Sequence, residues 1–306
     1  MGGDFAPETI VEGVVMAAAQ LPEGVQIVMV GRQSVIDTLL PRYSSTPLFN
    51  VQVVHAEDVI EMGEHPTKAL SQKPNSSIGI GFKLLKDKKI DAFCSAGNTG
   101  AMHVGALFSI KAIEGIIRPC IAGFVPQLQG GYAVMLDIGA NADCKPEMLA
   151  QFGEIGSVYA QATFGIEKPR VALMNIGSEE QKGSLIAQAA YQLLKESRRI
   201  DFVGNIEGGD MFAGKADVIV TDGFVGNTLF KLGESIYSLA QKRGISDAFI
   251  DKTNYESVGG SPILGVNGNV IIAHGISSAK AIKNMIGLAI RQVESDAHSK
   301  IAQMLS

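Results

Sequence analysis

Short runs of β-branched and apolar residues alternate with amphipathic helical segments along most of this 306-residue chain. Repeated strand-then-helix order predicts a largely parallel sheet covered by helices on both faces. Predicted strands lie at residues 25–30, 50–54, 90–94, 120–125, 132–136, 170–175, 201–203, 217–221 and 270–273. Predicted helices, with apolar residues at steps of three and four, lie at residues 7–20, 76–88, 99–113, 146–164, 184–196, 227–242 and 277–305. We therefore expect a three-layer α/β/α fold. Residues 1–306 are expected to form a single domain, which can divide into two lobes at a boundary that the sequence does not mark.

Composition narrows the classes of protein that this chain can belong to. Hydrophobic residues make up 46% of the chain, enough for a sizeable core, and a net charge of -5 without a long Lys/Arg run disfavours nucleic acid as the main partner. The odd number of cysteines, Cys94, Cys120 and Cys144, suits a reducing cytoplasm, where we expect them to be small buried hydrophobic residues. No apolar stretch approaches the roughly 20 residues of a membrane-spanning helix. We expect a cytoplasmic protein, and any contact with the inner face of a membrane is expected to be peripheral.

Glycine, Asn, Asp and Ser crowd the segments that directly follow six predicted strands. These segments are residues 97–99, 137–141, 175–183, 204–208, 222–227 and 274–278. Ligands of open α/β sheets bind beyond the carboxyl ends of the strands, so the six loops predict one shared cleft. In any one loop, Gly and Asn can equally well be ordinary turn residues. Their occurrence in all six loops favours a binding site.

Two of these loops lead into predicted helices and have the composition of anion-binding turns. Asn98, Thr99 and Gly100 open one helix, and Asn227 and Thr228 open another. A helix N-terminus presents unpaired N–H groups and the positive end of the helix dipole, so we predict that both turns bind phosphate. The alternative is that Asn98, Asn227 and Ser277 simply cap helices.

Several other motifs fail on their context. Residues 209–215 have the spacing of a P-loop, but Ala216 replaces the metal-binding hydroxyl and a strand follows instead of a helix. Residues 79–81 lie inside a helix and lack the third glycine of a dinucleotide fingerprint. The five histidines have no metal-ligand spacing. Glu179 and Glu180 could hold magnesium, but a solvated helix start is the favoured interpretation, and no metal site is predicted.

Eight ordered motifs over nearly the whole chain carry a family resemblance. They are Met-Gly-Gly-Asp at residues 1–4, Ser-Ala-Gly-Asn-Thr-Gly-Ala at 95–101, Arg-Pro at 118–119, Asp-Ile-Gly-Ala-Asn at 137–141, Glu-Gln-Lys-Gly at 180–183, Gly-Asn-Ile-Glu-Gly at 204–208, Asp-Gly-Phe-Val-Gly-Asn at 222–227 and Gly-Gly-Ser-Pro-Ile-Leu-Gly at 259–265. The chain resembles the PlsX family of phosphate acyltransferases. The resemblance implies transfer of a long acyl chain from acyl carrier protein to inorganic phosphate, giving acyl phosphate for bacterial phospholipid synthesis. It also implies a homodimer with a fold related to isocitrate and isopropylmalate dehydrogenases and to phosphotransacetylases.

Phosphate attack on a thioester can be catalysed by positioning and electrostatics alone, so no cofactor is expected. Lys182 is the candidate countercharge. The residues that could orient phosphate or polarise the thioester carbonyl are Asp137, Asn141, Asn205, Asp222 and His274. The alternatives are a phosphotransacetylase that uses a small acyl-coenzyme A, a dehydrogenase of the related fold, for which no nicotinamide site is found, and a non-catalytic scaffold, which would not explain the polar strand ends.

Two surfaces are candidate interfaces. The acidic acyl carrier protein would need a local basic patch, for which the candidates are Lys195, Arg198, Arg199, Lys242 and Arg243; their interpretation as solvated helix ends is slightly favoured. An apolar helical face, Leu229, Leu232, Ile236, Leu239 and Ala240, is expected to pack in a homodimer. Lipid binding is the weaker interpretation, because the face lacks dense positive charge and the region from 231 to 259 is short for the family.

Overall fold

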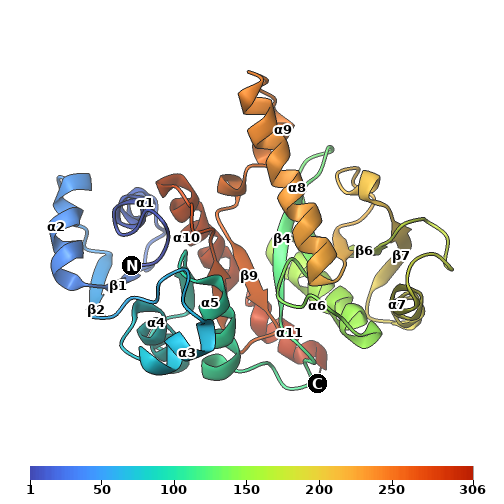
Figure 1. Cartoon of the computed structure of the whole chain (residues 1–306), viewed down its shortest axis with the longest axis horizontal. Helices are drawn as coiled ribbons and strands as arrows, with labels where there is room; N and C mark the ends of the chain where they lie inside the picture. The colour runs from blue at the N-terminus through green and yellow to red at the C-terminus, as the bar shows by residue number, and fades with distance from the viewer. Residues whose placement is uncertain (306) are drawn as a thin grey trace. The chain divides into compact units, whose positions relative to one another are not determined.

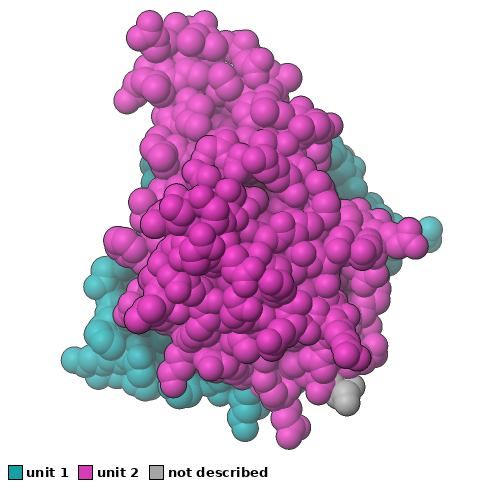
Figure 2. All heavy atoms as spheres, turned by 90° about the vertical axis from the view of Figure 1, so that its right-hand side faces the viewer, with its two compact units in different colours: residues 1–111, 255–261, 266–294 teal, residues 112–254, 262–265, 295–306 magenta. Residues whose placement is uncertain are grey.

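The structure, a computed structural model, describes residues 1–305 (Figure 1). The chain divides into two compact units (Figure 2). Unit 1 comprises residues 1–111, 255–261 and 266–294, and unit 2 comprises residues 112–254, 262–265 and 295–306. No helix within residues 1–305 combines the length and apolar composition that crossing a bilayer requires.

Unit 1 contains two pairs of parallel strands and the helices packed on them. Strand β1 (Ile27–Gly31) pairs with β2 (Val51–His55), and β3 (Ala92–Ser95) pairs with β10 (Asn269–Ile272). The helices are α1 (Glu8–Ala18), α2 (Gln33–Tyr43), α3 (Pro66–Gln72), α4 (Ser77–Lys86), α5 (Thr99–Gly105) with a π-helical extension η1 (Ala106–Ile110), the short 3₁₀ helix η3 (Tyr255–Ser257) and α10 (Ala279–Glu294). Helices α1 and α10 pack side by side, and Val11 and Val14 of α1 join Met29, Ile36 and Leu39 in one buried cluster.

A cavity of about 540 Å³, partly open to solvent, lies in unit 1. Its walls include Ile27 to Val30 of β1, Ala92 to Ser95 of β3, and apolar side chains of α1 and α10. The lining includes consecutive residues of β1 and β3 but no residue of β10, the strand that pairs with β3. The cavity therefore runs along the edges of β1 and β3.

Unit 2 is built on a mixed sheet with the strand order β9-β4-β5-β8-β6-β7. The strands are β4 (Cys120–Pro126), β5 (Tyr132–Leu136), β6 (Arg170–Met174), β7 (Asp201–Ile206), β8 (Val218–Val220) and β9 (Ser261–Leu264). Strand β4 is antiparallel to both β9 and β5, whereas β5, β8, β6 and β7 are all parallel. The helices are α6 (Pro146–Phe164), α7 (Leu185–Glu196), η2 (Gly208–Asp210), α8 (Gly223–Lys242), α9 (Ala248–Lys252) and α11 (Ala297–Leu305).

The core of unit 2 forms where α6 packs against the parallel strands. Phe152, Ile155 and Tyr159 of α6 are fully buried. The three residues of β8 are at most 1% exposed. Gly156 lets the helix backbone approach the sheet, because a Cβ there would meet side chains of Val218 and Leu136 at 2.5 and 2.7 Å. This close packing fixes the strand ends that carry the polar loops.

The predicted α/β class is confirmed, and every predicted strand overlaps an observed one. Strand β9 and helices α2, α3 and α9 were not predicted. Three predicted helix boundaries are wrong. The helix expected over 99–113 turns into a π-helix at Ala106 and ends at Ile110, and the helix expected over 277–305 is two helices separated at Asp296, whose φ is 50°. The helix expected to begin at Asn227 begins at Gly223.

Candidate functional site

Four of the six polar loops leave the same edge of the unit 2 sheet. They follow β5, β8, β6 and β7, which are parallel neighbours, so their carboxyl ends lie at one edge with about 4.8 Å between adjacent strands. The other two loops follow β3 and β10 of unit 1, which are also parallel neighbours. Each unit thus collects its own polar loops; the single cleft formed by all six stays a prediction.

Asp137 is the first residue of the loop that follows β5, and its side chain holds that loop together. Its side chain is fully buried and accepts hydrogen bonds from the N–H groups of Ile121 (2.8 Å), Ala140 (3.2 Å) and Asn141 (2.6 Å) and from Asn141 Nδ2 (3.0 Å). Burial raises the pKa of the Asp137 carboxyl above its ordinary value, and these donors oppose the shift. Asn141 Nδ2 also donates to the carbonyl of Pro119 (2.9 Å). Asp137 and Asn141, two of the side chains predicted to orient substrate, therefore stabilise the conformation of the 137–141 loop.

Helix α8 begins beside this loop, and its first turn is occupied by protein acceptors. Asp222 is the N-cap and accepts from the Val225 N–H (2.8 Å), and the Gly223 N–H donates to the carbonyl of Asn141 (2.7 Å). The prediction that Asn227 and Thr228 open this helix is therefore wrong, since both lie in its second turn, where backbone N–H groups bond within the helix. Thr228 Oγ1 donates back to the carbonyl of Phe224 (2.8 Å). Any anion contact there would have to come from side chains.

The exposed amide of Asn227 lies beside the 137–141 loop. A Cβ added to Gly139, whose φ is 135°, would come within 3.6 Å of Asn227 Oδ1. Asn227 therefore remains a side-chain candidate at this strand end, whereas Asp222 acts in the structure as a helix cap.

Lys182 lies in the loop that follows β6, and Asn205 of β7 is bonded to that loop. The carbonyl of Glu179 accepts from Asn205 Nδ2 (2.8 Å) and from the Lys182 N–H (3.1 Å), and Asn175 Nδ2 donates to the carbonyl of Lys182 (3.1 Å). The Lys182 side chain is 46% exposed, and its ammonium lies 4.0 Å from the Glu179 carboxylate. Asn205 Oδ1 is buried with no hydrogen-bond partner within residues 1–305. The loop thus presents a partly exposed cation, and Asn205, which donates to the loop backbone, has an unsatisfied acceptor oxygen.

Glu180 does not have the environment of a metal ligand. Its carboxylate accepts from Gln192 Nε2 (2.6 Å) and Lys195 Nζ (2.9 Å), and these two hydrogen bonds lower its pKa. The interpretation of Glu180 as a magnesium ligand loses support, because its oxygens already bind protein donors. Lys195, a candidate for carrier docking, is engaged in the same ion pair.

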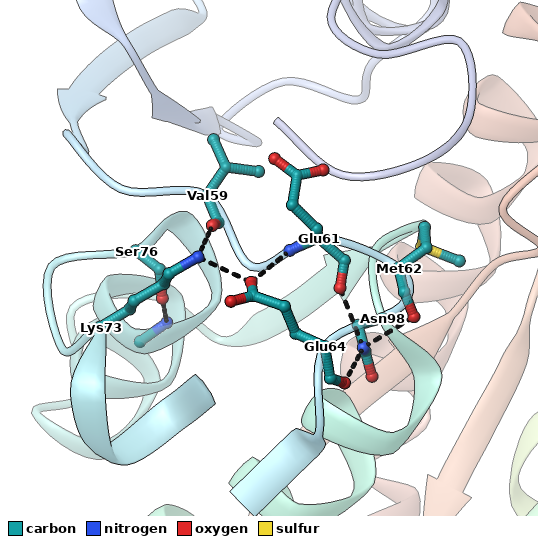
Figure 3. Close-up of polar contacts among 8 residues, drawn as sticks. Val59, Glu61, Met62, Glu64, Lys73, Ser76 and Asn98 are labelled. Atoms are coloured by element: carbon teal, nitrogen blue, oxygen red, sulfur yellow. Dashed lines mark hydrogen bonds and ion pairs between the residues drawn. The ribbon is translucent and has the colours of Figure 1, made fainter. Parts of the chain in front are cut away.

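Asn98 of unit 1 is a helix cap whose side chain is also held by a neighbouring loop (Figure 3). Its Oδ1 accepts from the Ala101 N–H (2.9 Å), which confirms the capping alternative for this residue. The Met102 N–H bonds to the Asn98 carbonyl, so the first-turn N–H groups that remain for an anion are those of Thr99 and Gly100. Gly100 needs to be glycine, because a Cβ there would collide with the ring of Pro66.

His274 and Ser277 lie in the loop that follows β10. The His274 ring lies 5.1 Å from the Tyr255 ring, centroid to centroid, and its carbonyl accepts from the Ser277 N–H (3.0 Å). The capping alternative for Ser277 is wrong, since Ser278 Oγ accepts from the Ala281 N–H (3.3 Å) at the start of α10. Ser277 Oγ is buried and has no hydrogen-bond partner in the described part of the chain.

The sequence did not indicate the loop that surrounds Asn98. Residues 59–64 come from another part of unit 1, and Lys73 and Glu64 fix their conformation (Figure 3). Lys73 and Asn98 both bond to residues 59–64, and no spacing within the sequence connects the two, so only the fold could reveal this link.

Comparison with known proteins identifies the family. The family model described as "Fatty acid synthesis protein" matches residues 1–300. A phosphate acyltransferase of Dictyoglomus turgidum is 42% identical over 325 aligned positions that cover 100% of this chain and 96% of the relative.

Solved structures show the same fold at low sequence identity. The EutD phosphotransacetylase of Staphylococcus aureus is 19% identical, with a TM-score of 0.64 over 94% of this chain and 92% of its own. The 4-hydroxythreonine-4-phosphate dehydrogenase of Klebsiella pneumoniae is 12% identical, with a TM-score of 0.56 over 92% of this chain and 94% of its own. These likenesses agree with the predicted α/β fold. The full-length match to the sequence relatives adds what the fold alone does not give: the chain is an enzyme of the phosphate acyltransferase family, as its motifs predicted.

Proposed function

We propose that the enzyme transfers a long-chain fatty acyl group from the thioester of acyl carrier protein to inorganic phosphate, and that the acyl phosphate enters phospholipid synthesis. A phosphate oxygen attacks the thioester carbon, the new C–O bond forms, the C–S bond breaks, and the carrier thiolate leaves. The observation that carries the proposal is the Lys182 loop. There the partly exposed side chain of Lys182 lies in a loop at the carboxyl end of a parallel strand, and Asn205 donates to the backbone of the same loop.

The cysteine side chains are poor candidates for forming an acyl-enzyme: Cys120 and Cys144 are buried, as expected, whereas Cys94 is only partly buried. Burial raises the pKa of Cys94 to about 12 and of Cys144 to about 12, and burial also raises the pKa of Cys120. The thiolate is the nucleophilic form, so these raised pKa values disfavour an acyl-enzyme on any of the three cysteines at neutral pH. Catalysis then depends on holding phosphate and polarising the thioester.

Within this proposal each unit has its own candidate contacts. In unit 1 the N–H groups of Thr99 and Gly100 are the candidate phosphate donors, while Asn98 shapes their turn. In unit 2 Lys182 is the candidate countercharge, and Asn141, Asn205 and Asn227 stay candidates for orienting a reactant. Asp137 and Asp222 act through the loop and helix that they stabilise.

The test is phosphate-dependent turnover of a purified carrier thioester. Palmitoyl-acyl carrier protein is incubated with the protein and phosphate, the free carrier thiol is measured, and acyl phosphate is trapped with hydroxylamine. We expect both products in equal amounts and neither without phosphate. Turnover of acetyl-coenzyme A with no turnover of the carrier thioester would establish the phosphotransacetylase alternative instead.

We also propose that the enzyme is a homodimer that uses the apolar face of α8. Leu232 and Leu239 are 61% and 62% exposed, and Leu229 and Ile236 are partly exposed on the same face, whereas Ala240 is buried. A stripe of leucines that is left in solvent on one copy can be buried against the same stripe of a second copy across a two-fold axis. The proposed interface therefore forms between two copies of this chain and requires no different protein.

Sedimentation of the wild-type protein and of Leu239→Glu tests the dimer. The wild type should sediment as a dimer at micromolar concentration and the variant as a monomer, with Ser238→Glu, an exposed neighbour on the same helix, as the control. A monomeric wild type would reject the dimer. Co-pelleting of the wild type with anionic vesicles would instead favour lipid as the partner of this face.

A further inference from the structure

One amide of unit 1 is surrounded by more acceptors than it has hydrogens. Asn98 Nδ2 carries two hydrogens but lies 3.1 Å from the carbonyl oxygen of Glu61 and 3.0 Å from those of Met62 and Glu64 (Figure 3). The same side chain caps α5 through its oxygen. The position of the three carbonyls therefore sets the orientation of Asn98, and Asn98 sets the first turn of α5.

Lys73 determines where those carbonyls lie. Its ammonium donates to the carbonyl of Val59 (2.8 Å) and to Glu64 Oε2 (2.6 Å), and that carboxylate oxygen also accepts from the Glu61 N–H (2.8 Å). The hydrogen bond from Lys73 is the main cause of the lowered pKa of Glu64. One cation thus fixes both ends of the loop of residues 59–64, which we call the Asn98 loop.

The backbone of Lys73 is anchored where α3 ends and α4 begins. Its N–H donates to the carbonyl of Ala69 (2.9 Å), and its own carbonyl accepts from the Ser76 N–H (3.0 Å). Ser76 Oγ then caps α4 by accepting from the Gly79 N–H (3.1 Å). The ammonium therefore reaches the Asn98 loop from a base held by two helices, and its side chain is only 31% exposed.

We propose that Lys73 is a positioning residue for phosphate binding, which acts through the Asn98 loop and Asn98 on the N-terminal turn of α5. Without the ammonium, the Glu64 carboxylate and the Val59 carbonyl lose their shared donor, and the three carbonyls no longer hold the amide. The N–H groups of Thr99 and Gly100 then lose their fixed direction. The identity of the anion rests on the proposed function.

Kinetics with Lys73→Met, Asn98→Ala and the double variant test this coupling. Lys73→Met should raise the KM for phosphate about 10-fold and change the KM for the carrier thioester less than 2-fold, the size of effect expected when one hydrogen-bond network around a charged ligand is loosened. Adding Lys73→Met to Asn98→Ala should produce no further rise. Lys73→Arg, which keeps both hydrogen bonds, should stay within about 3-fold of the wild type. Additive effects, or equal effects on both substrates, would overturn the proposal.

Hydrogen exchange without substrate separates this proposal from the assignment of phosphate. Lys73→Met should increase exchange of the Ala101 amide about 10-fold, and Lys68→Met, on the exposed side of α3, should leave it unchanged. An unchanged Ala101 amide in Lys73→Met would refute the role of Lys73. An unchanged KM for phosphate in Asn98→Ala would refute the phosphate assignment, whatever the exchange result.

Discussion

Replacing Asp137 with Asn should destabilise the enzyme strongly although the two side chains have the same shape. The Asp137 carboxylate accepts from four N–H donors, and an amide can offer an oxygen to only half of them. The amide nitrogen then faces two donors that are left without an acceptor. A buried unsatisfied donor costs about 1–3 kcal/mol, so we expect a loss of about 4 kcal/mol in the free energy of unfolding. For a chain of this size that corresponds to a decrease of about 8 °C in Tm, taking roughly 2 °C per kcal/mol.

Urea unfolding followed by circular dichroism measures the loss directly. Asp143→Asn is the matched control, because it makes the same change on an exposed residue six positions further along the loop, where substitutions usually change stability by less than about 0.5 kcal/mol. Activity of Asp137→Asn should fall as well, since the 137–141 loop accepts the first N–H of α8. A loss below about 1 kcal/mol would mean that the carboxylate is not the acceptor that holds this loop together.

Three further outcomes are expected. Lys182→Ala should lower kcat/KM for phosphate by about 10²–10³. The Tm should not change, because the only ion pair of the partly exposed Lys182 side chain among the described residues is the 4.0 Å contact with Glu179. Unchanged kinetics would remove Lys182 from the site. Rising ionic strength should raise the KM for acyl carrier protein, and Arg198→Ala should raise it more than Lys195→Ala, since Lys195 is already paired with Glu180; a salt-independent KM would exclude a charge-steered surface. Although burial opposes the shift, hydrogen bonds from Arg170 lower the pKa of Asp217, so this ion pair stabilises the fold above the ordinary Asp pKa of about 3.9 and the stabilisation is lost as the pH falls through the folded-state pKa. The difference in unfolding free energy between wild type and Asp217→Asn should therefore be constant at neutral pH and decrease below about pH 4; a difference that grows in acid would contradict this.

Buried strands were predictable from the sequence because their residues are apolar on both faces. Strand β5 has the predicted bounds, and α6 does as well, with Pro146 at its start and Gly165 in the left-handed conformation after its end. Strand β9 was missed because it has only four residues, one of them Pro262. The start of α8 was missed because Gly223 and Gly226 favour a loop by composition, whereas the fold needs glycine at both positions to bring the helix against the backbone of the 137–141 loop.

The residue types of the site were predictable, but the partners of each atom were not. Asn98 was correctly placed at a helix start, since an Asn before a helical segment is a strong local signal. Its amide, however, binds carbonyls that lie 34 to 37 positions earlier in the chain. The donor from Ile121 to Asp137 is likewise 16 positions away. Such contacts depend on tertiary packing, so the sequence predicted candidate ligands where the structure shows loop and helix stabilisation.

The cavity of unit 1 bears on how the protein behaves at high concentration. Strand β1 pairs only with β2 among the described strands, and β3 is the last strand in its sheet order, so each has one edge whose N–H and C=O groups have no strand beside them. Both edges line the cavity. Unpaired edges are templates for the addition of another extended segment. Unit 1 therefore has, along this cavity, two unpaired strand edges to which an extended segment of a second chain could add.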